Sequence, residues 1–530
     1  MRLPLTPQDL GLPEKFREWR GCQELAIGRA LQPGRRFQAH AMPTGSGKSL
    51  AYVAAALISG ERTLILTSTK GLQDQIMRDF GACGVVDLRG QQNYACRMGP
   101  GVNCEHGKLA GCQDAKTTAC PHRRTIEVAK RSQVVVTNYA CWIANLIAGE
   151  NLGRWDAIVM DEAHSAPDEV CGMMSVEVTS AEVLGMLGAD FPETEEPEDW
   201  RSWASMLVPQ ATVKRDTLAQ LVSADPSPSL SLVAELRRWT SLVRKLSRLS
   251  DARGPWVVEA TRSGYRADPL WPSQYAEQVV FNGAPRVYAY SATITPKTLH
   301  IMGAAPDEVE YFEYPSVFPA SRSPVYRIPT CRVDRHMDAS SRALWISRID
   351  QIVGQRLDRK GIIHCVSYER RKEIMERSAY GRYMVGHTRE DTAETIRWFR
   401  DARPPLVLVS PSVTTGYDFP LEDCEFQIVA KLPFPDSRSK VVRARANSDP
   451  LYIPYLTIQI LIQETGRGMR STQDQCENFI LDDHIARMLA AHRDQFLGWW
   501  LKLYQRRNLI PDPPPPLGVS GQPLTTYQGG

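Results

Sequence analysis

The sequence predicts an α/β protein made of two related lobes, each built on a parallel sheet. Short apolar runs, typical of buried parallel strands, precede polar residues in both halves of the chain. In the N-terminal half they lie at 63–66, 134–136, 157–160 and 287–290. In the C-terminal half they lie at 361–366, 406–409, 426–430 and 479–481. Helical stretches separate the runs, and this alternation places functional loops at the strand ends.

Composition and charge are ordinary for a globular protein. Of the 530 residues, 43% are hydrophobic and 23% are charged, and the net charge is +3. This balance does not indicate a nucleic-acid partner, although a local groove can be basic while the whole chain is near neutral. No apolar run approaches ~18 residues, and the N-terminal residues lack the apolar segment of a signal peptide. We therefore expect no membrane span.

Residues 42–49 form a candidate phosphate-binding loop between a predicted strand at 37–41 and a predicted helix at 49–58. Glycines let several N–H groups face one anion, and the helix N-terminus adds positive charge. The loop residues that we expect to contact ATP are Thr44, Gly45, Ser46, Gly47, Lys48 and Ser49. Lys48 would reach the β- and γ-phosphates, and Ser49 would bind Mg²⁺. The strict motif begins with glycine where this chain has Met42, so a chance glycine-rich turn is the alternative.

Two further features would complete an ATP site. Asp161 and Glu162 follow the predicted strand at 157–160, where an aspartate can hold Mg²⁺ and a glutamate can activate water. His164 is expected to couple this site to the other lobe. About one helix before the loop, Arg20 and Gln23 are candidates for the adenine site, because an amide can read a base edge. Ordinary surface side chains are the alternative for this pair.

The C-terminal half carries its own set of candidates. Gln463 is expected to position water, and Arg467 and Arg470, three residues apart, are expected to stabilise the γ-phosphate during its transfer. Small polar loops follow two predicted strands and would contact phosphates of ATP or nucleic acid. Their residues are Ser291, Ala292 and Thr293 in one loop, and Gly416 and Asp418 in the other.

Four of the twelve cysteines are spaced eight residues apart: Cys96, Cys104, Cys112 and Cys120. Four thiolates can hold either a zinc ion or a [4Fe–4S] cluster. The absence of closely spaced cysteine pairs favours the larger cluster, and zinc stays an alternative. Residues 85–125 carry six Lys or Arg and three Asp or Glu. This basic segment, with Tyr94 and Arg97, is expected to contact nucleic acid.

The stretch 168–275 differs in character from the rest and is predicted to be a mostly helical insertion. Residues 190–199 hold six acids, and 232–249 form a basic amphipathic helix with apolar residues at helical spacing. The cations of this helix are Arg237, Arg238, Arg244, Lys245 and Arg248. They favour DNA contact and a solvated helix face about equally.

Together these motifs resemble superfamily 2 helicases of the XPD/DinG type. The matching pieces are MPTGSGKS, LRGQQNYAC, VVVTNYA, DAIVMDEAH, YSATITP, VSPSVTTGYDFP with KLPFP, and QETGRGMRS, spanning residues 42–471. The resemblance implies two RecA-like P-loop motor domains, with an iron–sulfur insertion and a helical arch-like insertion in the first. It also implies an ATP-dependent, 5′→3′ motor on single-stranded DNA, acting in repair, replication or recombination. In that family Asp161 and Glu162 belong to the DEAH box, and the four spaced cysteines hold the [4Fe–4S] cluster.

The resemblance also gives the expected domain limits. Motor domain 1 comprises 1–84, 126–168 and 276–300; the iron–sulfur insertion is 85–125, the arch-like insertion 169–275, motor domain 2 301–510, and a Pro-rich tail without fixed structure 511–530. Gly468 stands where the family usually has a bulky apolar residue, so we expect a looser helix there. The expected cofactors are ATP, Mg²⁺ and [4Fe–4S], and the expected partners are single-stranded and forked or overhang duplex DNA.

The expected protein is a cytoplasmic or nucleoid-associated monomer, with no membrane partner and with no protein partner indicated. The alternative function is a nucleotide-gated, redox-sensing nucleic-acid-binding protein with little unwinding activity. The complete C-terminal arginine motif disfavours that alternative, because a switch does not need paired arginines.

Overall fold

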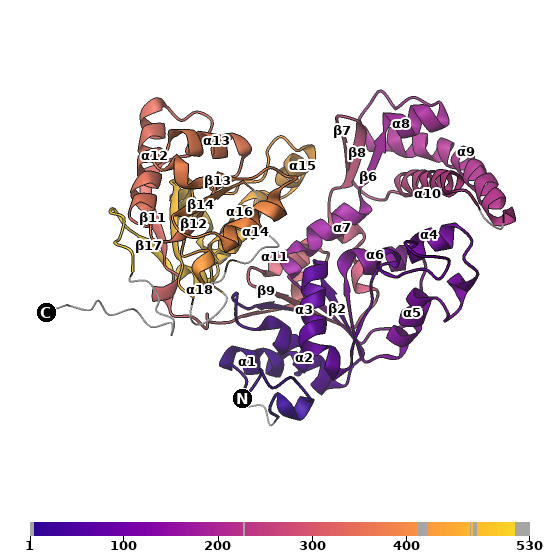
Figure 1. Cartoon of the computed structure of the whole chain (residues 1–530), viewed down its shortest axis with the longest axis horizontal. Coiled ribbons are helices and arrows are strands. Elements are labelled where there is room, and N and C mark those ends of the chain that lie inside the picture. The colour runs from indigo at the N-terminus through magenta and orange to yellow at the C-terminus, as the bar shows by residue number, and fades with distance from the viewer. Residues whose placement is uncertain are drawn as a thin grey trace. The chain divides into compact units, whose positions relative to one another are not determined.

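The chain folds into two compact units, here described from a computed structural model. The described residues are 5–225, 228–411, 419, 421–466, 468–469 and 474–514. Unit 1 comprises 1–40, 49–312 and 436–449, and unit 2 comprises 41–48, 313–435 and 450–530. Figure 1 shows the elements of both units along the chain. None of the described helices combines the length and the apolar composition that a membrane span requires.

Unit 1 is built on a seven-stranded sheet of order β10-β1-β9-β5-β2-β4-β3. The strands are β1 (Phe37–Ala41), β2 (Thr63–Thr67), β3 (Val85–Asp87), β4 (Val134–Asn138), β5 (Ala157–Asp161), β9 (Arg286–Ser291) and β10 (Val309–Glu313). The pairs of β5 with β2 and with β9 are parallel. Every residue of β1, β2, β4 and β5 is buried. The apolar runs at 63–66, 134–136, 157–160 and 287–290 are therefore strands, as predicted.

Helices lie between these strands along the chain. They are α1 (Gly21–Ala30), α2 (Lys48–Ser59), α3 (Lys70–Phe80), α4 (Cys104–Leu109), α5 (Pro121–Arg131), α6 (Tyr139–Ile147), α7 (Ala166–Met174) and α11 (Pro296–Ile301). Local chemistry fixes several starts. The Asn138 side chain caps α6 by accepting from the Cys141 N–H at 2.8 Å, and proline opens α5, α7 and α11.

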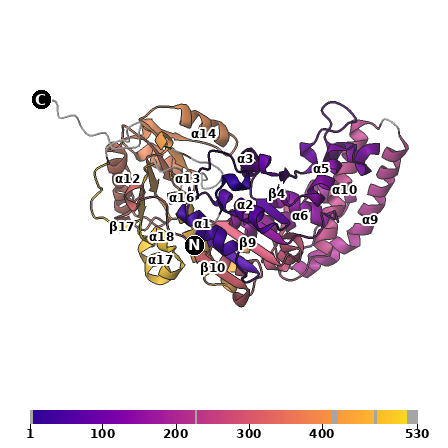
Figure 2. The same ribbon diagram turned by 90° about the horizontal axis from the view of Figure 1, so that it is seen from below.

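The insertion after α7 contains a helical hairpin and a small sheet. The helices are α8 (Ser180–Glu182), α9 (Pro197–Ala224) and α10 (Leu230–Ser250), and α9 and α10 lie side by side (Figures 1 and 2). The helix predicted at 232–249 is thus confirmed. The antiparallel sheet, of order β6-β8-β7, was not predicted; its strands are β6 (Val176–Thr179), β7 (Trp256–Ala260) and β8 (Gly264–Pro269). Aromatic rings join sheet and hairpin, since Trp200 of α9 lies 4.7 Å from Tyr265 of β8 between ring centroids.

Unit 2 holds a second seven-stranded sheet, of order β13-β14-β12-β15-β16-β11-β17. Its strands are β11 (Val325–Cys331), β12 (Lys360–His364), β13 (Met384–Gly386), β14 (Leu406–Ser410), β15 (Phe426–Val429), β16 (Glu477–Asp482) and β17 (Tyr504–Arg506). All six pairings are parallel, and Val407, Ile428 and Phe479 lie in the buried core. The strand predicted at 361–366 ends early, because Val366 has a left-handed backbone with φ 68°.

The helices of unit 2 are α12 (Ala339–Gly354), α13 (Tyr368–Arg377), α14 (Thr392–Asp401), α16 (Tyr452–Thr465), α17 (His484–His492) and α18 (Gly498–Leu501). One helix of this part of the chain, α15 (Lys440–Ser448), belongs instead to unit 1. The expected tail without fixed structure begins within the described residues. The carbonyls of Pro511 and Pro514 accept hydrogen bonds from Arg356 and Arg359, and residues 515–530 lie outside the described part.

Candidate functional site

The phosphate-binding loop has the backbone that its glycines predict. Gly45 and Gly47 adopt left-handed conformations, with φ 73° and 77°, which glycine accepts without a steric cost. The Ser46 N–H donates to the Pro43 carbonyl at 3.2 Å and closes the turn, and α2 begins at Lys48. Met42 is fully buried and does not have a positive φ. The replaced glycine of the strict motif is therefore not needed for the turn.

The two expected Mg²⁺ ligands, Ser49 and Asp161, lie near the same phenol in unit 1. Burial raises the pKa of Tyr52 on α2 well above its usual value, and the Asp161 carboxylate raises it further, while the Ser49 hydroxyl opposes the shift. Asp161 ends β5 and is almost fully buried, and its carbonyl accepts from the Tyr139 hydroxyl at 3.3 Å. A serine hydroxyl and a carboxylate that meet at a strand end form a suitable oxygen site for Mg²⁺.

The backbone at Glu162 is strained. Its φ of 46° and ψ of 45° place a non-glycine residue in the left-handed region, which costs about 1–3 kcal/mol. Such strain persists where the surrounding structure fixes the residue, and it gathers at functional sites. Here it directs Glu162 beside His164, whose Nδ1 lies 3.3 Å from the Glu162 Oε2.

The structure brings the expected coupling residues together. His164 Nδ1 and Ser291 Oγ are hydrogen-bonded at 2.8 Å, and the Ser291 Oγ lies 3.4 Å from the Thr293 Oγ1. Ala292, between them, is buried. This geometry follows from the sheet, because β5 and β9 are neighbours with Asp161 opposite Tyr290. The acids of the first motif and the hydroxyls of the second thus form one connected corner.

The expected adenine-site residues fold on each other. Arg20 precedes α1, and its N–H donates to the Gln23 Oε1 at 3.0 Å. Gln23 is only 3% exposed. The amide oxygen of Gln23 therefore also serves as a helix cap, so the residue has a structural role beside the predicted one.

In unit 2 the described residues include part of the predicted set. Gln463 lies near the end of α16, which stops at Thr465, and the Trp500 Nε1 donates to the Thr465 Oγ1 at 2.9 Å. Arg467, Arg470, Gly416 and Asp418 lie outside the described residues.

The expectation of a loosened helix at Gly468 is wrong, for two reasons. The residue follows the helix end rather than lying inside the helix. A Cβ at this position would overlap the Cys476 sulfur and stand 3.1 Å from the Cys424 carbonyl oxygen. The glycine is therefore required by close packing.

The four spaced cysteines converge in pairs. Cys96 and Cys112 Sγ atoms are 3.8 Å apart, and Cys104 and Cys120 Sγ atoms are 3.5 Å apart. Burial and the neighbouring Cys120 raise the pKa of Cys104 to about 11. A Cβ at Gly107 of α4 would overlap the Cys96 sulfur, so a glycine keeps this space open. Among the described residues, no three or more His, Cys, Asp or Glu side chains lie close enough together to hold one metal ion.

Tyr94, which was predicted to stack on bases, is used inside the protein. Its hydroxyl accepts from the Arg89 N–H at 3.1 Å, and its ring packs edge-on against His122 at 5.2 Å between centroids. The exposed cations of the segment lie elsewhere. Arg97 has 62% of its side chain exposed, and a hollow beside α5 is lined by Lys116, Arg124 and Arg131.

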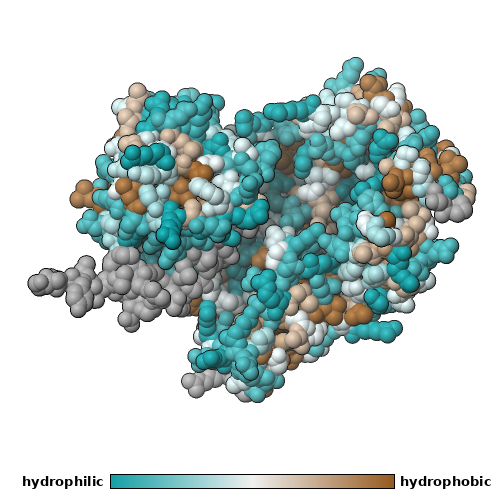
Figure 3. Space-filling model, viewed as in Figure 1, coloured by the Kyte–Doolittle hydropathy of each residue, from teal (hydrophilic) through white to brown (hydrophobic). Residues whose placement is uncertain are grey.

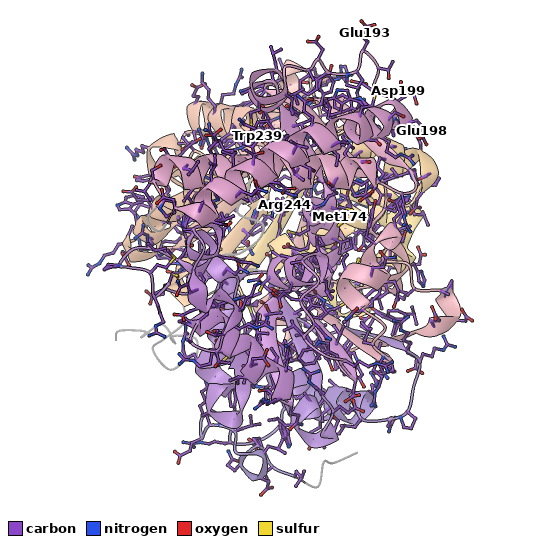
Figure 4. The ribbon with its side chains drawn as sticks, turned by 90° about the vertical axis from the view of Figure 1, so that its right-hand side faces the viewer. Met174, Glu193, Glu198, Asp199, Trp239 and Arg244 are labelled. Atoms are coloured by element: carbon purple, nitrogen blue, oxygen red, sulfur yellow. The ribbon has the colours of Figure 1, made fainter. Side chains whose placement is uncertain are left out.

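The basic face of α10 is partly engaged with its own unit. Arg237 bonds to His106 Nε2 at 3.1 Å and to Glu105 at 3.3 Å, which links the hairpin to α4. Lys245 pairs with Glu182 at 2.6 Å, and Arg248 donates to the Met173 carbonyl. Arg238 and Arg244 are exposed, and Figure 4 shows Arg244 on the side of α10 where Met174 lies. Glu193, Glu198 and Asp199 lie at the opposite edge.

The free end of the hairpin is apolar. Leu221 is 53% exposed and Leu230 is 88% exposed, and Figure 3 shows hydrophobic side chains gathered there. The basic side and the apolar end of the hairpin are therefore separate surfaces.

Comparisons with known proteins agree with this geometry. Residues 20–178 match the DEAD/DEAH box helicase family model, and residues 355–502 match the helicase C-terminal domain model. Among curated proteins, the ATP-dependent DNA helicase YoaA of Haemophilus influenzae is 39% identical over 80 residues. That match covers 13% of this chain and 12% of the relative.

Among solved structures, an XPD helicase aligns with a TM-score of 0.63 and 15% identity, covering 92% of this chain and 99% of the other. The Xpd4 protein of S. tokodaii aligns with a TM-score of 0.57 and 14% identity, covering 92% and 100%. These likenesses show that the chain has the fold of those proteins, with two RecA-like motor domains. A motor of this fold uses ATP and Mg²⁺.

Proposed function

Because the chain belongs to the helicases of the XPD/DinG type, we propose that it hydrolyses ATP to move 5′→3′ along single-stranded DNA and to separate strands. The processes that need such a motor are DNA repair, replication and recombination. We further propose that it works as a monomer in the cytoplasm or at the nucleoid, on forked or overhang duplexes. The limits expected from the sequence for its motor domains and insertions are part of this proposal.

The observation that carries the proposal is the joined corner of His164 and Ser291. Their 2.8 Å hydrogen bond connects the acids that handle ATP to the loop that follows the neighbouring strand. A protein that only binds nucleotide does not need this connection. A motor does, because the state of the γ-phosphate must change the structure elsewhere in the chain.

The residues supply the parts of phosphoryl transfer. The loop of Thr44 to Gly47 surrounds the phosphates, and Lys48 neutralises the β- and γ-phosphates. Ser49 and Asp161 hold Mg²⁺, and Glu162 takes a proton from the attacking water. We propose that Gln463 orients that water and that Arg467 and Arg470 stabilise the charge that develops on the γ-phosphate. Gly416 and Asp418 are proposed to contact phosphates from the same lobe, and Arg20 and Gln23 to hold the adenine.

Single-stranded DNA is proposed to run along the basic side of the insertion. Arg244 and Arg238 of α10 are exposed there. Lys116 and Arg124 of the cysteine segment line a hollow together with Arg131, which follows that segment at the end of α5. Cations of this kind bind the phosphate backbone without reading the sequence. The binding should therefore weaken steeply as salt is raised.

We propose that Cys96, Cys104, Cys112 and Cys120 hold a [4Fe–4S] cluster. The donor set supplies four thiols in two close pairs, and Gly107 leaves room beside Cys96. Because no three of the described thiols gather at one point, cluster binding would have to draw the two pairs together. When bound, the cluster would cross-link a segment that lacks a large core of its own. The close sulfur pairs also suit zinc, whose Zn–S distance is about 2.3 Å. Iron and zinc analysis of anaerobically purified protein separates the two.

The proposal is tested by ATP hydrolysis with and without single-stranded DNA. Wild type should be stimulated severalfold by DNA, and Lys48→Ala should lose hydrolysis with and without DNA, because the γ-phosphate loses its main countercharge. Lys502→Ala, which changes a lysine far along the chain from the motifs, serves as the control. If neither DNA nor RNA stimulates the wild type, the proposed function is wrong.

The polarity needs its own substrates. Strand displacement should occur on a duplex with a 5′ overhang and not on the matching duplex with a 3′ overhang. Displacement that requires the 3′ overhang would reverse the proposed direction and leave the motor assignment intact.

A further inference from the structure

A short piece of the C-terminal half folds as part of unit 1. This crossover segment, residues 436–449, contains α15, while the chain on both sides of it belongs to unit 2. Only Pro450 and Leu451 separate it from α16, the helix that carries Gln463. The segment is therefore joined through the chain to unit 2 on both of its sides.

Both ends of the crossover segment are fastened to unit 1. At the start of α15, the Lys440 N–H donates to the Glu259 Oε2 of β7 at 3.0 Å. An acid at a helix N-terminus is favoured by the helix dipole. After the helix, Asp449 pairs with Lys297 at 2.6 Å. Lys297 lies on α11, four residues beyond Thr293 of the coupling loop.

The centre of the segment is anchored by one buried arginine. Arg445 is 7% exposed, and its Nε donates to the Leu270 carbonyl at 2.6 Å. Its Nη2 lies 3.3 Å from the Pro269 carbonyl and 3.1 Å from the Cys171 sulfur of α7. Its guanidinium also lies 5.6 Å from the Trp271 ring centroid. One side chain thus joins α15, the end of β8 and α7.

The charge of Arg445 acts on a carboxylate near the DEAH box. Asp168 lies on α7, four residues after His164. Burial raises the pKa of Asp168, and the charges of Arg445 and then His164 oppose that rise. Arg445 is thus electrostatically connected to Asp168, and Asp168 to the histidine that bonds Ser291.

We propose that Arg445 is a positioning residue of the motor, which holds α7 and the insertion in the arrangement that makes ATP turnover respond to DNA. It acts through its contact with Cys171 of α7, the helix that carries Asp168 and follows His164, and it touches neither ATP nor DNA in this role. The proposal rests on the proposed function, since it assigns a residue to the coupling between hydrolysis and DNA.

The test compares Arg445→Gln with Arg443→Gln in the full chain. Arg443 lies on the same helix, is exposed, and bonds only to nearby carbonyls of its own segment. We expect Arg445→Gln to lower the DNA-stimulated kcat about tenfold, within the range of ordinary allosteric couplings. The KM for ATP and the affinity for single-stranded DNA should stay within about twofold, and Arg443→Gln should match wild type.

A role in folding alone is separated by the double variant Arg445→Gln with Asp168→Asn. Because the double change removes both partners of the charge interaction, it should recover at least half of the lost stimulation on a logarithmic scale. A simple packing role predicts additive losses instead. If Arg445→Gln does not fold, Arg445→Lys keeps the charge without the fork and should show partial stimulation.

The outcomes distinguish the two proposals. Wild type without DNA stimulation overturns the proposed function. Wild type with stimulation, together with an unchanged Arg445→Gln or additive losses in the double variant, overturns the role of Arg445 alone.

Discussion

Gly107→Ala tests whether the four cysteines form one metal-binding unit. Gly107 lies in α4, between Cys104 and Cys112 in sequence. A Cβ at this position would overlap the Cys96 sulfur and stand 3.2 Å from the Cys96 Cβ and 3.6 Å from the Cys112 Cβ. The Cys96 side chain would have to move away from Cys112. One of the four thiolates would then no longer reach the group that the others hold.

Two opposing energies set the size of the effect. Alanine is favoured over glycine inside a helix by about 0.5–1 kcal/mol, which by itself predicts stabilisation. Overpacking a tight site costs about 1–3 kcal/mol. The clash involves Cys96, a proposed metal ligand, rather than a long flexible side chain, so we expect the cost to prevail and any bound metal to be lost. A gain in stability would mean that the site is not as tight as described.

The assay is the metal content and the visible colour of protein purified without oxygen. Wild type should be brown if it holds an iron–sulfur cluster, and Gly107→Ala should lose at least half of its metal. Gly99→Ala is the matched control, because a Cβ at Gly99 in the same segment meets no atom within 4 Å. Gly107→Ala protein with the metal content of wild type would refute the reasoning.

Two further predictions concern buried charges of unit 2. Burial raises the pKa of Glu425 to about 7, so its stabilising contribution is full below about pH 4.5 and is lost as the pH rises through 7. Glu425→Gln should therefore raise the free energy of unfolding by about 1–2 kcal/mol at about pH 8, after allowing for solvent screening, and change it little at about pH 5. The melting temperature measured at the two pH values checks this, and equal shifts at both would contradict it. Arg356 and Glu477 form a buried pair at 2.8 Å, and Glu477→Gln should cost about 3–5 kcal/mol in urea unfolding because it strands a buried cation. The exposed pair of Lys372 and Glu376 gives the control, Glu376→Gln, for which a loss above about 1 kcal/mol would be unexpected.

The parallel strands and the motifs that follow them could be predicted because both are local in sequence. Strands such as the one at 157–160 are buried on both faces, and a strand buried on both faces needs apolar residues at every position, which is visible in the sequence. Gly45 and Gly47 likewise predict a loop with left-handed backbone conformations, and both residues have a positive φ. Once the strands are known to be neighbours, the meeting of His164 with Ser291 follows.

The sheet of β6, β7 and β8 could not be predicted from such runs. Its strands have only one buried face, and β6 shows this as buried Val176 and Val178 separated by exposed Glu177. Two alternating residues are too weak a signal inside a region dominated by two long helices. The partner of β6 is also some ninety residues away along the chain, at Gly264–Pro269.

The burial of Arg445 could not be predicted from the sequence either. The crossover segment is polar, and an arginine in such a segment is ordinarily solvated. Its burial depends on carbonyls at the end of β8 and a sulfur on α7, which lie in a distant part of the sequence. Gly468 gives the same lesson, because its requirement comes from Cys476 and Cys424 rather than from its own neighbours.

The strain at Glu162 and the anchoring of the crossover segment concern the same stretch of chain. Glu162 is held in a left-handed conformation that costs about 1–3 kcal/mol, and couplings between sites are typically of about that size. Of the residues that follow it, His164 bonds Ser291, and α7 contacts Arg445 at Cys171. We expect that losing either interaction would let the backbone after β5 relax and change the orientation of the Glu162 side chain. The strained residue, which we propose as the general base, and both contacts thus lie in the same short stretch of chain after β5.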